Sequence, residues 1–232
     1  MASLHASTAP HAIDSPRFAP IVSLDSDVPG GGALFAMDVG GTGEAHVRLA
    51  CAVGALLTGQ QAHPGRGAAV MVSLALEELE RLDVDSLVTA LIADGIGADR
   101  LVVRVPQYTA GVPNPVLERI AARGVTVAVA SLVVPPGDAA RLAGAPIDVV
   151  ELPPLLVEDV DRTPTSPERL EPWLGLAHSL DWLVLARNVR RPGQARALHR
   201  LGCDLAAGPL MGAPVDPAMF ATADRRRSRL AG

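Results

Sequence analysis

The sequence contains no lysine, so all 20 of its basic residues are arginine. This absence excludes mechanisms that need a lysine, such as Schiff-base chemistry or the phosphate-binding lysine of a P-loop. The abundance of Ala, Gly, Pro and Arg makes codon usage in a GC-rich genome the simplest explanation. Aromatic residues are also scarce, at 3% of 232 residues, which leaves few side chains for stacking on bases. The excess of 25 acidic over 20 basic residues gives a net charge of −5, so we expect no general nucleic-acid binding.

Cysteines and long hydrophobic runs are also rare. The two cysteines, Cys51 and Cys203, lie far apart and show no metal-ligand or redox spacing, so we expect reduced, buried thiols. The longest apolar run, residues 124–136, is too short to cross a bilayer. Residues 1–16 lack the basic and apolar regions of a signal peptide. We therefore expect a cytoplasmic protein that makes no membrane contact.

Short apolar strands alternate with helical segments along most of the chain. The first two strands, residues 18–24 and 33–39, flank a turn rich in Asp, Pro and Gly and predict a β-hairpin. Further strands are predicted at residues 67–74, 101–105, 125–129, 147–152, 182–186 and 203–206. Helices are predicted at residues 44–57, 77–82, 85–92, 114–123, 138–142, 167–179 and 192–201, with 155–166 irregular.

The predicted strands are apolar along nearly their whole length and are separated by helices. This pattern is typical of a parallel sheet that is buried on both faces. About seven such units after a hairpin favour a closed α/β barrel. The sequence predicts a loose tail at residues 1–16, one barrel domain over 17–221 and a basic tail at 222–232.

Several segments resemble one protein family in order and spacing. Residues 201–214, LGCDLAAGPLMGAP, resemble the C-terminal signature of EAL domains, the bacterial cyclic-di-GMP phosphodiesterases. Residues 18–24, FAPIVSL, resemble the family's opening strand, and residues 100–105, 124–129 and 147–152 follow at family spacing. The resemblance implies a TIM-type barrel whose first strand is antiparallel. It also implies an active site at the carboxyl ends of the strands, where acidic and amide side chains hold two divalent cations that activate a water.

Each position that corresponds to a catalytic residue of the family holds a different residue type in this chain. These positions are Gly32, Ser73, Arg104, Gln107, Ala130, Ser131, Glu151, Pro153, Arg187, Arg190 and Ala207. The resemblance places a Glu, a Lys and a Glu where this chain has Arg104, Glu151 and Arg187, so the charges are reversed. A cationic side chain repels a divalent metal ion, the largest charge in such a site. We therefore expect no metal, no other cofactor and no phosphodiesterase activity.

Two interpretations of Arg104, Glu151 and Arg187 stay open from the sequence. They form either a self-compensating salt-bridge cluster or an anion site in which the two guanidiniums bind phosphate or carboxylate. The first functional hypothesis is accordingly an inactive EAL-like barrel that regulates through contacts with another protein, as a homodimer in the manner of many family members. The second is a metal-independent sensor of cyclic-di-GMP or another anionic ligand. Against the second, Ala36 and Ala207 replace a family Arg and Gln, so cyclic-di-GMP binding is not expected.

Overall fold

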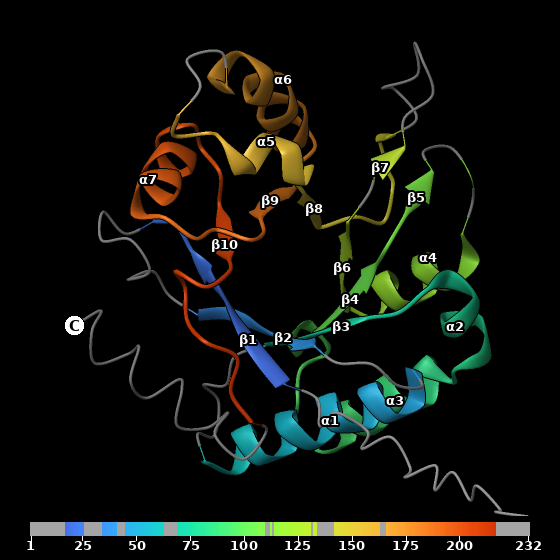
Figure 1. Cartoon of the computed structure of the whole chain (residues 1–232). Coiled ribbons are helices and arrows are strands. Elements are labelled where there is room, and N and C mark those ends of the chain that lie inside the picture. Colours follow the sequence, from blue (N-terminus) through green and yellow to red (C-terminus); the bar gives the residue numbers. More distant parts are fainter. Residues whose placement is uncertain are drawn as a thin grey trace, which may run out of the picture.

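The computed structural model describes residues 17–25, 34–40, 45–62, 69–109, 112, 114–130, 132–133, 142–162 and 166–216. Eight strands close into a barrel in the order β1-β10-β9-β8-β6-β4-β3-β2 (Figure 1). They are β1 Arg17–Ser23, β2 Leu34–Gly40, β3 Ala69–Ser73, β4 Leu101–Val105, β6 Thr126–Val129, β8 Val149–Glu151, β9 Leu183–Ala186 and β10 Leu205–Ala207. Strand β1 is antiparallel to both of its neighbours, β2 and β10, and the remaining pairs are parallel. The predicted α/β barrel with an antiparallel first strand is thus confirmed.

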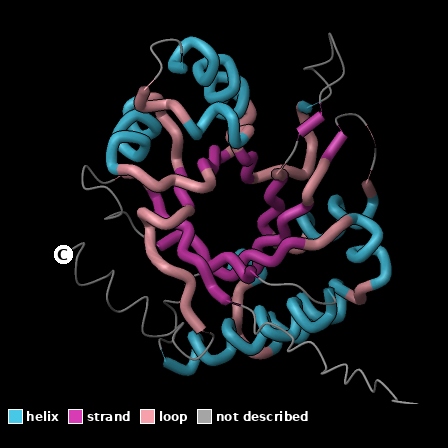
Figure 2. Tube along the Cα trace, in the orientation of Figure 1, coloured by secondary structure: helices cyan, strands magenta, loops and turns pink. Residues whose placement is uncertain are grey.

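Helices surround the barrel on its outer side (Figure 2). They are α1 Ala45–Ala62, α2 Leu76–Arg81, α3 Val84–Ala93, α4 Pro115–Ala122, α5 Pro154–Glu158, α6 Ser166–Ser179 and α7 Pro192–Arg200, with a 3₁₀ turn at Ala98–Arg100. The start of helix α4 is set by the capping residue Asn114 and by a proline in the first turn. The side chain of Asn114 accepts a hydrogen bond from the backbone N–H of Leu117 at 2.9 Å, and Pro115 occupies the first turn. Among the described residues, no helix is long and apolar enough to cross a membrane.

Alternation along each strand separates the core into two layers. One set of side chains points outward and packs under the helices, as Val72, Val103 and Val150 do. The other set fills the barrel interior, and it consists of Ile21, Ala36, Met71, Val102, Ala128, Val149, Leu185, Leu205 and Ala207. The interior is therefore a packed core and leaves only its carboxyl-terminal end for polar side chains.

Three details differ from the sequence prediction. Residues 155–166 were expected to be irregular, but α5 occupies Pro154–Glu158, because a proline is well suited to the first turn of a helix. The last strand is Leu205–Ala207 instead of 203–206, a shift at the boundary. Two unpredicted strands, β5 (Tyr108–Thr109) and β7 (Leu132–Val133), form a small parallel sheet beside the barrel. The predicted tails and the predicted helix at residues 138–142 lie almost entirely outside the described residues.

Candidate functional site

Four polar side chains meet at the carboxyl-terminal end of the barrel. Strand alternation directs them inward, since each of Asp38, Arg104 and Glu151 stands two residues after an interior residue, and Arg187 stands two residues after Leu185. They come from β2, β4, β8 and the end of β9, which are distant in sequence. The barrel topology therefore assembles the Arg104, Glu151 and Arg187 trio expected from the sequence.

Glu151 is the centre of this arginine–carboxylate cluster, defined as Asp38, Arg104, Glu151 and Arg187. Arg104 donates to both Glu151 oxygens, from Nε to Oε1 at 2.7 Å and from Nη2 to Oε2 at 2.8 Å. Arg187 donates from Nη1 to Oε1 of Glu151 at 3.2 Å and from Nη2 to Oδ2 of Asp38. The two-point contact between Arg104 and Glu151 is the strongest geometry open to an Arg–carboxylate pair. Two positive and two negative charges leave the cluster formally neutral.

The cluster is largely removed from water. Glu151 is 6% exposed and Asp38 is 8% exposed. Burial of Arg187 lowers the pKa of its guanidinium, but the adjacent Asp38 and Glu151 carboxylates outweigh burial, and the pKa is raised above its ordinary value. Arg187 therefore stays charged at neutral pH.

The other positions that correspond to family catalytic residues contribute little to this end of the barrel. Ser73 accepts a hydrogen bond from Nη1 of Arg104 at 2.8 Å and so extends the cluster to β3. Ala130, Pro153 and Ala207 have side chains without a polar atom. Gly32 and Ser131 lie outside the described residues.

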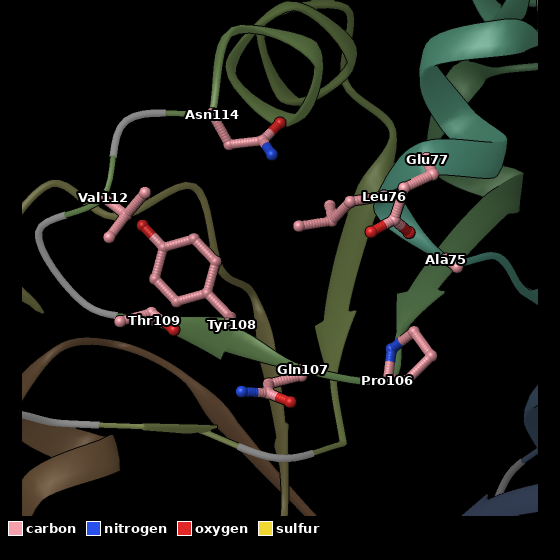
Figure 3. Close-up of a pocket in the computed structure, with 9 residues that line it drawn as sticks. All are labelled: Ala75, Leu76, Glu77, Pro106, Gln107, Tyr108, Thr109, Val112 and Asn114. Carbon is pink, nitrogen blue, oxygen red and sulfur yellow. The ribbon is translucent and has the colours of Figure 1, made fainter.

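Two further positions line cavities, and Arg190 shares one with Arg187 of the cluster. Gln107 lines a separate cavity beside β5 (Figure 3). Arg190 donates from Nε to the side chain of Asn188 at 3.0 Å.

Asp38 was missed by sequence reasoning. It stands two residues after Ala36 on β2, so the two-residue periodicity of a strand was the signal that could have placed it in the interior. Its carboxylate matters because it supplies the second negative charge that balances Arg187.

The two divalent cations implied by the family resemblance do not fit this donor set. The two carboxylates present, Asp38 and Glu151, already bind guanidiniums, and two cationic side chains occupy the same space. Across the described ranges, no group of three or more His, Cys, Asp or Glu side chains is placed to hold a metal ion. Hard cations such as Mg²⁺ or Ca²⁺ need several converging oxygen ligands. The geometry favours the salt-bridge interpretation of the trio, and the anion site stays a prediction.

Comparison with known proteins gives one family and one fold. The EAL domain family model matches residues 42–214, three quarters of the chain. The EAL enzyme Bd1971, in its cAMP and cyclic-di-GMP bound form, superposes with a TM-score of 0.74 at 15% identity. The superposition covers 91% of this chain and 64% of Bd1971, so this chain spans less than two thirds of that protein.

Two other solved structures are similar over nearly their whole length. The EAL domain of Mycobacterium smegmatis DcpA gives a TM-score of 0.70 at 18% identity, covering 91% of this chain and 96% of that one. The PaMucR phosphodiesterase, in complex with c-di-GMP, gives 0.67 at 16% identity, covering 87% and 91%. At these identities the likeness shows the fold. No curated protein sequence matches the chain.

Proposed function

Since the chain belongs to the EAL domain family, whose members are normally cyclic-di-GMP phosphodiesterases, we propose that it is a catalytically inactive member. In this proposal the barrel holds no metal, hydrolyses no cyclic-di-GMP and regulates through contacts with another protein. The observation that carries the proposal is the arginine–carboxylate cluster at the carboxyl end of the strands, where the active sites of such barrels lie.

Electrostatics support the loss of metal binding. A unit charge pair at about 4 Å interacts by roughly 4 kcal/mol at an effective dielectric constant of about 20. A divalent ion at this end of the barrel meets two guanidinium charges, Arg104 and Arg187, and can recruit Glu151 only by breaking its three hydrogen bonds to them. The carboxylates that could attract a metal ion are therefore already neutralised by the two arginines.

The donor chemistry of the remaining positions supports the same proposal. Hydrolysis on a two-metal site needs carboxylate or amide oxygens from several strands to hold the ions and orient the water. At the described positions this chain offers Ser73, Ala130, Pro153 and Ala207 instead, and the one amide, Gln107, lines the separate cavity beside β5. Ser73 is already an acceptor for Arg104.

The alternative is a metal-independent sensor of cyclic-di-GMP or another anion. It is favoured by relatives whose structures contain cyclic-di-GMP and by the partial exposure of Arg187, whose side chain is 31% accessible. Against it, both guanidiniums are already paired with carboxylates, and Ala36 and Ala207 offer a ligand only methyl groups.

Two titrations test the proposal. Electron paramagnetic resonance of Mn²⁺ should show free ion only, because the cluster repels it. Calorimetry with cyclic-di-GMP, with and without Mg²⁺, should show no heat of binding. Tight Mn²⁺ binding contradicts the inactive barrel, whereas Mg²⁺-independent micromolar binding of cyclic-di-GMP selects the sensor.

Sedimentation of the same sample tests the proposed homodimer, and a concentration-independent monomer contradicts it.

A further inference from the structure

The outer face of α7 carries positive charge in a chain that is acidic overall. Residues 182–203 contain five arginines and no aspartate or glutamate, whereas the whole chain has a net charge of −5. Two of these arginines, Arg196 and Arg200, lie four residues apart on α7 and are here named the α7 arginine face. An acidic partner is attracted to this face while the net charge of the chain repels it elsewhere.

The packing of α7 directs both arginine side chains outward. Gln194 and Leu198, on the opposite side of the helix, are buried against the barrel. Arg196 and Arg200 are both exposed. Residues four apart on a helix share one face and are separated by about 6 Å along its axis, so one group can contact both side chains.

A second pair of arginines with the same spacing shows how this chain neutralises such a pair. On α4, Arg119 and Arg123 lie four residues apart, and both contact Asp85 of the neighbouring helix α3. The distances from Nε to a carboxylate oxygen of Asp85 are 3.2 Å for Arg119 and 3.6 Å for Arg123. The shared carboxylate offsets the repulsion between two like charges one helical turn apart.

The α7 arginine face has no such carboxylate in the part of the chain that the structure describes. Neither guanidinium there has an ion-pair or hydrogen-bond partner. Asp161, an acidic residue near the start of α7, is bound by Arg191 instead. One turn before Arg196, Pro192 and Gly193 have no long side chain, so another backbone can approach the face closely.

We propose that the α7 arginine face docks an acidic helix of a partner protein. A glutamate or aspartate of that helix is shared between Arg196 and Arg200, in the way that Asp85 of α3 is shared on α4. The proposal rests on the proposed regulation through contacts with another protein, and it names the surface and the chemistry of that partner. Figure 1 shows α7 and α4 on opposite sides of the barrel, so the two arginine pairs are separate.

The composition of α7 favours a protein over a nucleic acid as the partner. Single-stranded nucleic acids bind where cationic side chains are combined with aromatic rings on which bases stack. Helix α7, with the sequence PGQARALHR, has no Phe, Tyr or Trp. Carboxylates, in contrast, need only the guanidinium groups that the face presents.

A peptide titration of the full chain tests the proposal. The probe is a fluorescein-labelled, alanine-based helical peptide whose glutamates are four residues apart, and binding is followed by fluorescence anisotropy at low salt, where screening is weakest. It should bind saturably with a Kd of about 100 μM. A peptide of the same composition with glutamates two residues apart should bind at least about three-fold more weakly, because its carboxylates do not share a face.

Two double variants with the same change in net charge locate the surface. Arg196→Gln/Arg200→Gln should raise the Kd about ten-fold, because two exposed charge contacts are lost. Arg119→Gln/Arg123→Gln is the matched control, since that pair already shares Asp85, and it should change the Kd less than about two-fold. Glutamine is a good helix former, so an unchanged circular dichroism spectrum is expected for both variants.

Each contrary result overturns a defined part of the proposal. Absence of saturable binding, or equal Kd values for the two peptides, overturns the docking surface. Equal losses in the two double variants overturn its location on α7. An oligothymidylate of equal charge that binds more tightly than the peptide, and is weakened by Arg196→Gln/Arg200→Gln, overturns the protein partner.

Turnover of cyclic-di-GMP, measured on the same preparation, separates this proposal from the proposed function. Absence of both turnover and peptide binding removes the docking surface and leaves the inactive barrel. Turnover together with peptide binding contradicts the inactive barrel and leaves the docking surface.

Discussion

Replacement of Glu151 by alanine tests whether the arginine–carboxylate cluster exists as an interacting unit. The substitution removes the acceptor of three charge-assisted hydrogen bonds, two from Arg104 and one from Arg187. Removing one partner of a buried ion pair typically costs about 3–5 kcal/mol of unfolding free energy. The arginine side chains are 20% and 31% exposed, and Arg187 keeps Asp38, so the lower end, about 3 kcal/mol, is expected here. For a chain of this size that corresponds to a fall in Tm of roughly 6–12 °C.

Urea denaturation of three variants measures the effect and its origin. A double-mutant cycle combines Glu151→Ala, Arg104→Ala and the double variant. The loss of unfolding free energy in the double variant should be about 2 kcal/mol smaller than the sum of the two single losses. Glu171→Ala, at an exposed site on α6, is the matched control and should change stability by less than about 0.5 kcal/mol. The interaction between Glu151 and Arg104 is refuted if Glu151→Ala lowers the unfolding free energy by less than about 1 kcal/mol, or if the losses of the two single variants add up to that of the double variant.

Three further outcomes follow from single residues. The pKa of Tyr108 is raised above 10.0, so above about pH 10 the folded state keeps a proton that the unfolded chain releases, and the free energy of unfolding should fall as the pH rises. A tyrosinate absorbance titration of the folded protein with an ordinary tyrosine pKa would contradict this. Gly208→Ala should cost about 3 kcal/mol or more, since φ is +142° and a Cβ would lie 2.4 Å from the backbone nitrogen of Val189, and an unchanged Tm contradicts it. Burial raises the pKa of Cys203 to about 12, so in a Cys51→Ser background the folded protein should not react with a thiol reagent at pH 8, whereas the unfolded chain should.

The barrel was predictable because two independent signals agree. Apolar strands alternating with helices indicate a parallel sheet buried on both faces, and the LGCD-type signature at residues 201–214 fixes the family. What the pattern could not show were elements too short to have a period. Strands β5 and β7 are two residues each, and α5 begins at the second of two prolines that also mark a break.

The site was predictable only where the family pattern pointed to it. Arg104, Glu151 and Arg187 were brought together as expected, since the carboxyl ends of neighbouring barrel strands converge. Asp38 belongs to no family position that the resemblance marks, so its part in the cluster emerged from the packing. The cavity beside β5 was likewise invisible in sequence, because α2, the β4–β5 segment and α4 meet there only in three dimensions.

Turnover of cyclic-di-GMP tests the central claim most directly. The purified chain is incubated with cyclic-di-GMP and either Mg²⁺ or Mn²⁺, the linear product is quantified by chromatography, and the PaMucR phosphodiesterase serves as the positive control. The account predicts no product above the metal-only blank, because Arg104 and Arg187 occupy the space that metal ions would need. Hydrolysis that scales with the concentration of the chain and stops when the metal is chelated would contradict it.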